Sequence, residues 1–125
     1  MVSAATRAYA PRMSELCIVN GRDLRASGRA IHNAVARQTA AGEPEGGWLP
    51  GERITIEAAI EAYSTGSAHA AFEDHRRGRI AVGLDADLAV LDLDLLADGT
   101  SAIIGTTAVA TLVGGRIVHR TEGPE

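Results

Sequence analysis

Lysine is absent from this sequence and cysteine almost so, and each scarcity excludes a class of protein. All twelve basic residues are arginine, the formal net charge is −4, and no basic stretch carries interleaved aromatic residues. Nucleic acid is therefore not expected as a partner. The single cysteine, Cys17, excludes an internal disulfide framework and a cysteine-rich zinc site. The expected compartment is the cytoplasm.

Long apolar runs are missing as well. The longest uncharged stretch lies between Asp98 and Arg116, and glycine, threonine and serine interrupt it. A membrane span needs about 20 predominantly apolar residues, so no contact with a membrane is expected. Residues 1–12 lack the apolar core of a secretory signal and are expected to be frayed.

Aromatic side chains are few, and the complete set is Tyr9, Trp48, Tyr63 and Phe72. The core must therefore be built from alanine, valine, isoleucine and leucine. Small aliphatic side chains bury less area per residue than aromatic rings do. A fold of this composition is expected to have only marginal stability on its own, which suggests that a partner surface is missing.

The first part of the chain predicts one strand and one helix. The apolar run Leu16–Val19 is closed by Asn20 and Gly21, as is typical of a buried strand ended by a turn. Beyond it, apolar residues recur at the spacing of one helix face. Ser27 is the expected N-cap of this helix, and Gly42 is expected to end it.

A loop and two further helices are predicted next. Residues 42–51 are rich in glycine and proline, which favours a loop. Thr55 is the expected N-cap of a helix over residues 56–63. The sequence Ser64–Gly66 should break that helix, and a short helix over residues 67–72 should follow.

Short strands dominate the rest of the chain. Residues 78–83 read as an extended piece between two glycines, and Asp87–Asp92 as an apolar strand bracketed by aspartates. Val109–Val113 and Arg116–His119 form a predicted hairpin, because the Gly114–Gly115 pair between them suits a two-residue turn. The predicted fold class is α+β, with helices followed by short C-terminal β-strands.

Four short motifs run in order along the second half of the chain. They are the helix start Pro50–Ala59, the helix break Ala62–Ala68, the glycine-bounded segment Gly78–Asp92 and the closing segment Thr111–Val118. In this order and spacing they resemble the C-terminal end of amidohydrolase family 3, which belongs to the metal-dependent amidohydrolase superfamily.

The resemblance implies an architecture for each part of the chain. Members of that family pair a (β/α)8 barrel with a small composite β-domain built from both chain ends. Residues 1–47 would then be a remnant of the last barrel strand and helix. Residues 48–120 would supply the C-terminal helices and β-strands of the family, and residues 121–125 a disordered tail.

The resemblance also implies a chemistry. The family hydrolyses C–N bonds other than peptide bonds with a divalent metal such as zinc. No His-x-His pair occurs in this sequence, so we expect no cofactor in this chain and no activity from it alone. The alternative is a non-catalytic structural or assembly module that self-associates or completes a partner chain, so the expected partner is a second copy or the missing barrel portion.

Asp23 is the one catalytic candidate that the resemblance carries over. The family's last barrel strand ends in a Gly-Ser-Asp step whose aspartate acts on the attacking water. Here Gly21 and Asp23 match that step, whereas Arg22 replaces its small residue and the aromatic-proline step after the aspartate is missing.

His69, Glu73 and His75 form the one cluster of histidine and acidic residues. His69 and Glu73 are spaced to share a helix face, and neutral histidine with carboxylate suits a divalent metal. They are weak metal-ligand candidates, and an independent metal-binding protein is the third functional hypothesis. The alternative interpretation is an exposed polar helix end.

Other polar residues receive structural interpretations. They are Cys17 as a buried structural thiol, His32 and His119 as surface or half-buried side chains, and Asp85, Asp87, Asp92 and Asp94 as turn and strand-end caps, with a local backbone bond for Asp87.

A last expectation concerns exposed apolar surface, which monomers seldom leave open beyond a few hundred Å². Helices that would pack on an absent barrel need some cover. Self-association is therefore predicted, with Trp48, Leu49, Ile56, Ile60 and Tyr63 near the contact.

Overall fold

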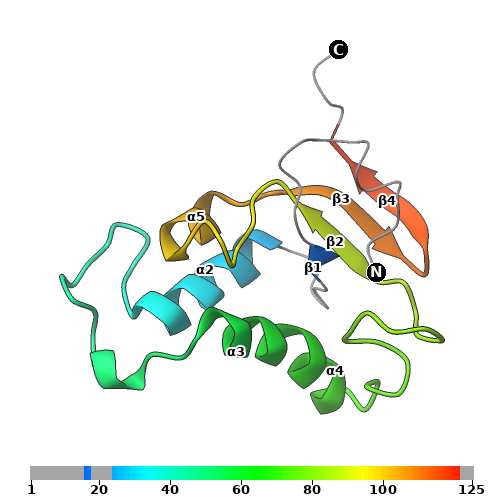
Figure 1. Cartoon of the computed structure of the whole chain (residues 1–125), viewed down its shortest axis with the longest axis horizontal. Helices are drawn as coiled ribbons and strands as arrows, with labels where there is room; N and C mark the ends of the chain where they lie inside the picture. The colour runs from blue at the N-terminus through cyan, green and yellow to red at the C-terminus, as the bar shows by residue number, and fades with distance from the viewer. Residues whose placement is uncertain (1–15, 18–23, 122–125) are drawn as a thin grey trace.

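The computed structural model describes residues 16–17 and 24–121 of the chain. Its elements are β1 (Leu16–Cys17), α2 (Leu24–Ala36), the 3-10 turn η1 (Pro50–Glu52), α3 (Ile56–Glu61), the π turn η2 (Ala62–Gly66), α4 (Ser67–Ala70), β2 (Leu88–Leu91), α5 (Thr100–Gly105), β3 (Ala108–Val113) and β4 (Arg116–Arg120). The helices gather beside one end of the sheet (Figure 1), so the α+β class is confirmed. The predicted frayed N-terminus and nearly all of the predicted tail lie outside the described residues.

The strands form one antiparallel sheet in the order β1-β2-β3-β4. The predicted strand at residues 87–92 is confirmed as β2, and the predicted hairpin as β3 and β4. Gly114 and Gly115 form its tip with φ angles of 55° and 78°. Both central positions of this turn need a positive φ, which glycine adopts without steric cost.

The core lies where the helices meet β2. Its buried members are Ile31 from α2, Ala59 from α3, Ala89 and Leu91 from β2, Leu95 from the following turn and Ile103 from α5. Apolar side chains of α3 and η2, including Ile56, Ile60 and Tyr63, are partly buried against this cluster. These three residues therefore pack partly on the chain's own core, and their place near a self-association contact stays a prediction.

Helix α2 has different ends from those predicted. It begins at Leu24, so Ser27 lies within the helix and is not its N-cap. It ends at Ala36, and Arg37 adopts a left-handed φ of 58° well before Gly42. The backbone of Arg37 is held on both sides, because its amide donates to Asn33 O at 3.0 Å and its carbonyl accepts from the amide of Trp48 at 2.8 Å.

The segment from α3 to α4 is one continuous helical rod rather than two broken helices. Thr55 is confirmed as its N-cap, since its Oγ1 accepts from the amide of Ala58 at 3.2 Å. The predicted break is wrong: Gly66 is helical, with φ −62° and ψ −42°. The middle of the rod is the π turn η2, whose hydrogen bonds span one residue more than those of an α-helix. Within it, Ser64 Oγ donates to Ile60 O at 2.7 Å. Ser67 is also helical and is not a cap.

Two segments of the second half differ from the prediction. Residues 78–83 form a loop without strand pairing, closed where the amide of Asp85 donates to Arg76 O at 2.7 Å. Helix α5 was not predicted, because it falls in a stretch without a clear apolar period, yet its Ile103 is only 1% exposed. Within residues 16–17 and 24–121, no helix has the length and apolar character needed to cross a bilayer.

Candidate functional site

The predicted site residues do not come together as one ligand set. Asp23 lies outside the described residues. His69, at the end of α4, places Nδ1 3.4 Å from Asp74 Oδ2, whereas Glu73 faces arginine side chains. Across the described part of the chain, no group of three or more His, Cys, Asp or Glu side chains is arranged to hold a metal ion. Metal binding by His69, Glu73 and His75 stays a prediction.

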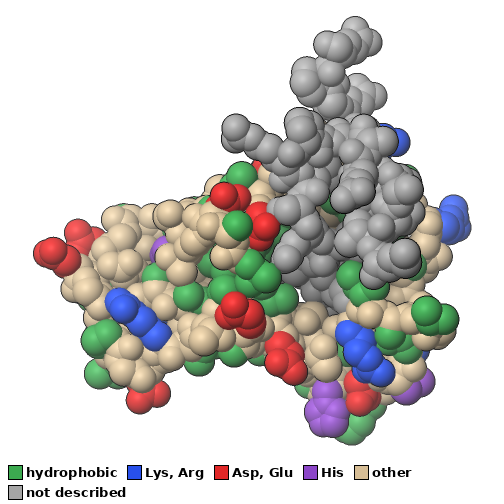
Figure 2. All heavy atoms as spheres, in the orientation of Figure 1, with side chains coloured by type: hydrophobic (Ala, Val, Ile, Leu, Met, Phe, Trp, Pro, Cys, Tyr) green, Lys and Arg blue, Asp and Glu red, His purple; other side chains and the backbone are tan. Residues whose placement is uncertain are grey.

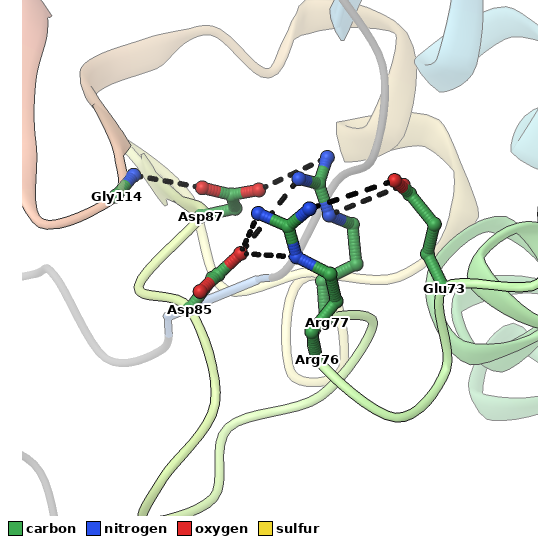
Figure 3. Close-up of polar contacts among 6 residues, drawn as sticks. All are labelled: Glu73, Arg76, Arg77, Asp85, Asp87 and Gly114. Carbon is green, nitrogen blue, oxygen red and sulfur yellow. Dashed lines mark hydrogen bonds and ion pairs between the residues drawn. The ribbon is translucent and has the colours of Figure 1, made fainter.

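The charged residues that do converge join the loop after α4 to the start of β2. Figure 3 shows Arg76 and Arg77 between Glu73 on one side and Asp85 and Asp87 on the other. Arg77 Nη1 lies 3.3 Å from Asp87 Oδ2, and Arg77 Nε lies 3.3 Å from Glu73 Oε2. Arg76 forks onto Asp85 Oδ2, with Nη2 at 2.6 Å and Nε at 2.8 Å. We call these five residues the arginine–aspartate network.

Neighbouring groups shift the pKa of two solvent-exposed side chains, Arg76 in the network and Asp74 beside it. The hydrogen bond to Asp85, together with the charge of that carboxylate, raises the pKa of Arg76 above its usual value. The hydrogen bond with His69 lowers the pKa of Asp74 below its usual value. Both shifts show that the charged form of the group is favoured over its neutral form. Each group is solvent-exposed, so salt screening keeps the energetic effect small.

The network also reaches the tip of the β3–β4 hairpin. Asp87 Oδ1 accepts from the amide of Gly114 at 2.8 Å, and Ala86 O accepts from the amide of Gly115 at 3.0 Å. The expected local backbone bond of Asp87 is therefore replaced by one to a distant residue. Both the Ala-Asp pair and the Gly-Gly pair belong to motifs visible in the sequence, but their pairing with each other is visible only in the fold.

The chemistry of this network is structural. Three carboxylates face two guanidinium groups, and charge-assisted contacts of this kind hold segments in a fixed geometry. Arg77 Nε is buried without a well-aligned hydrogen bond, so its contact with Glu73 is ionic. The carboxylates and guanidinium groups of the network pair with one another, and we assign them no acid–base role.

The remaining aspartates mostly act as predicted. Asp92 accepts from both the amide and the Oγ1 of Thr107, at 2.9 and 2.8 Å. Asp94 Oδ1 accepts from the amides of Leu96 and Ala97. Both are therefore confirmed as caps. The prediction for Asp85 is wrong, because its carboxylate pairs with Arg76 and Arg77.

Histidine burial was only partly predicted. His119 is exposed on β4, as expected. His32 is only 6% exposed, so its predicted surface position is wrong. Its Nδ1 lies 3.2 Å from Thr100 O on α5, and its Nε2 lies 3.3 Å from Thr39 O in the loop after α2. Whichever ring nitrogen carries the proton, its N–H can donate to the carbonyl beside it, so the buried ring has a hydrogen-bond partner.

The motifs gathered around the network belong to a known family. Residues 20–119 match the sequence model of the amidohydrolase family, and the chain is a member of amidohydrolase family 3. The family is generally metal-dependent. No solved structure matches the chain significantly.

Three curated relatives share part of their sequence with this chain. The protein LONG AFTER FAR-RED 3 of Arabidopsis thaliana is 36% identical over 72 residues, which are 58% of this chain and 12% of that protein. The N-substituted formamide deformylase of Arthrobacter pascens is 33% identical over 90 residues, 72% of this chain and 16% of the enzyme. YtcJ of Bacillus subtilis (strain 168), whose name describes it as an amidohydrolase, is 30% identical over 89 residues, 71% and 17% of the two chains. This chain thus spans 12–17% of the relatives' lengths.

Proposed function

We propose that this chain is the C-terminal part of an amidohydrolase-3-like hydrolase that acts on non-peptide C–N bonds, and that it is inactive alone. One observation carries the proposal: a match to the family over residues 20–119 that spans only 12–17% of the relatives' lengths. A relative named N-substituted formamide deformylase suggests an amide substrate.

The described residues do not fit a resident divalent metal. A catalytic metal site needs about three convergent protein ligands. Glu73 is held by two arginines and His69 contacts Asp74. We therefore derive no catalytic step through a metal from residues 24–121. Asp23 stays our proposal for the aspartate that acts on the attacking water once the metal-binding part is present.

In this proposal the chain supplies structure to the complete enzyme. Helices α2 to α4 would lie against the barrel, and the sheet would belong to the composite β-domain. Strand β4 supports this role, because all five of its residues are exposed, Ile117 and Val118 by 58% and 62%. An apolar edge strand is a ready template for further strands.

The second candidate is a non-catalytic assembly module that self-associates or completes a partner chain. The exposure of Trp48 and Leu49, at 62% and 52%, favours it, since large apolar side chains grouped on a surface mark an interface. For both candidates we propose a cytoplasmic location and expect neither nucleic acid nor a membrane as a partner.

An assay and the adjoining coding sequence test the proposal together. The purified chain, supplied with an N-substituted formamide and Zn²⁺, should release no formate. Saturable release that a chelator abolishes and Zn²⁺ restores would overturn its inactivity.

The coding sequence upstream separates the two candidates. A His-x-His pair upstream, in the same or a shifted frame, supports the hydrolase proposal, and the chain extended through that frame should hydrolyse the formamide. Upstream sequence with no metal-ligand histidines would refute the hydrolase proposal and leave the assembly module.

A further inference from the structure

On the basis of the second proposed function, a module that self-associates, we propose that the arm between α2 and α3 binds strand β4 of a second copy of this chain. The arm is residues 38–55, and its surface is acidic and apolar. Strand β4 is basic and apolar. Charge complementarity and exposure at two opposite ends of one molecule carry this inference.

The arm is an ordered structure rather than a loose loop. The guanidinium of Arg37 lies over the ring of Trp48, 4.9 Å from its centroid, and Arg37 Nε donates to Trp48 O at 3.1 Å. Arg53 Nη2 donates to Gly46 O at 2.6 Å. The side-chain Nε2 of Gln38 donates to the backbone carbonyls of Gly42 and Pro44. These contacts hold an exposed surface in one shape, which lowers the entropy lost on binding.

The arm carries a net negative charge. Within residues 38–55, Glu43, Glu45 and Glu52 are exposed and outnumber the one arginine, Arg53, which is also exposed and donates to the arm's own backbone. None of these three carboxylates forms an ion pair with any residue among 28–121. They surround an apolar surface made by Trp48, Leu49 and Ile54, which are 62%, 52% and 43% exposed.

Strand β4 has the complementary character. Arg116 and His119 are exposed, and between them lie Ile117 and Val118, at 58% and 62% exposure. The strand ends the sheet, so within the described chain its outer edge pairs with no other strand. Like charges would oppose one another if two β4 strands paired symmetrically about Val118, which disfavours that dimer.

The positions of the two surfaces require a second molecule. The arm and β4 lie at opposite ends of the long axis of the chain (Figure 1). Figure 2 shows acidic and hydrophobic side chains at the arm end with a basic side chain among them, and a mixture of basic, acidic, hydrophobic and histidine side chains at the other end. The contact is therefore head-to-tail: each copy offers its arm to one neighbour and its β4 to the next. Such a contact builds an open chain of copies, or a ring if the rotation closes.

Sedimentation over a range of concentrations tests the contact. The wild-type chain should form species larger than a dimer as concentration rises, and added salt should weaken them because it screens the charges. Trp48 is the only tryptophan, so its emission should shift to shorter wavelength as copies associate. A chain that stays monomeric with unchanged Trp48 emission would overturn the proposal.

Charge reversal identifies the two surfaces. Glu45→Lys on the arm and Arg116→Glu on the strand should each weaken association by roughly tenfold, equivalent to about 1.4 kcal/mol. Glu61→Lys is the matched control, since Glu61 is an exposed glutamate on α3, outside both surfaces. It should leave association unchanged apart from the effect of net charge. Equal effects of Glu45→Lys and Glu61→Lys would contradict the arm's role.

Mixing the two variants distinguishes an arm-to-β4 contact from a contact between two like surfaces. The Arg116→Glu chain keeps an intact arm, and the Glu45→Lys chain keeps an intact β4. Together they should associate again, because one contact then has both wild-type surfaces and the other pairs the introduced lysine with the introduced glutamate, whereas a contact of arm with arm or of β4 with β4 would show no such rescue. Leu49→Asn tests the apolar part separately, because asparagine tolerates the left-handed φ of 48° at this position. A folded Leu49→Asn chain that associates like wild type would refute the apolar contact.

Discussion

The carboxylate of Asp87 accepts a hydrogen bond from the amide of Gly114 at 2.8 Å, although 27 residues separate them. Its second oxygen lies 3.3 Å from Arg77 Nη1. The half-buried carboxylate of Asp87 thus joins the tip of the β3–β4 hairpin to the loop after α4 (Figure 3). The two oxygens of this one side chain hold the loop after α4 against the sheet.

Removing that carboxylate should loosen the hairpin. Asp87→Ala is expected to lower the free energy of unfolding by about 1–3 kcal/mol, because Gly114 and Arg77 both lose a partner. Urea denaturation followed by circular dichroism measures the change. Asp87→Asn is the control: its amide oxygen can still accept from Gly114, so the loss should be smaller. Equal losses in the two variants would show that the Gly114 bond contributes nothing.

The hairpin tip gives a second prediction. Gly115→Val should destabilise the chain by about 1 kcal/mol or more, since Gly115 has a φ of 78°, which a β-branched residue rarely adopts. Crowding is not the cause, because an added Cβ would lie 3.9 Å from Ala86 Cβ. Gly115→Asn should cost less, as asparagine tolerates this conformation. An unchanged thermal midpoint for Gly115→Val would contradict the turn assignment.

Two other glycines separate backbone strain from close packing. Gly78 and Gly83 both have positive φ, at 100° and 90°. A Cβ on Gly78 would lie 2.6 Å from the Cβ of Ala68, whereas a Cβ on Gly83 would meet nothing within 4 Å. Gly83→Ala should therefore cost about 1 kcal/mol from strain. Gly78→Ala should cost clearly more, at least about 2 kcal/mol, because a packed region must also shift. Thermal unfolding of both variants side by side measures the difference, and equal midpoints would show that Gly78 is not closely packed.

The pair of His69 and Asp74 predicts a pH response. The pKa of Asp74 is lowered in the folded chain by the hydrogen bond with His69. A lowered carboxyl pKa stabilises the fold above the unfolded pKa, and this contribution is lost as pH falls through the folded pKa. Carbon NMR titration should place the Asp74 midpoint below the usual value of 3.8. His69→Gln should move the midpoint back toward 3.8, and no movement would contradict the pairing.

Local pattern was sufficient for several elements. An apolar run bracketed by aspartates predicted β2, the Gly-Gly pair predicted the hairpin, and Thr55 predicted a helix start. Each of these signals acts between residues a few positions apart, as turn geometry and capping do. The order of four such motifs was also enough to predict the family, which the match over residues 20–119 confirms.

Local pattern failed where distant contacts outweigh it. Gly66 and Ser64 favour a break by propensity, yet the rod continues through them because Ser64 bonds to Ile60 and the helix is packed on the core. Arg37, rather than a glycine, ends α2 in a left-handed conformation because Trp48 and Asn33 hold its backbone. Helix α5 carries little periodic signal and is stabilised by burial of Ile103.

The sequence by itself therefore determined the short-range features of this protein: strand β2, the β3–β4 hairpin with its turn, the Thr55 cap and membership of the amidohydrolase family. Only the tertiary structure decided what those features contact. It pairs Asp87 with Gly114 and Arg77, buries His32 beside two carbonyls, and bonds Arg37 and Arg53 to the backbone of the arm. The reason is physical: propensity acts over a few residues, whereas burial and ion pairing depend on where the whole chain brings distant groups together.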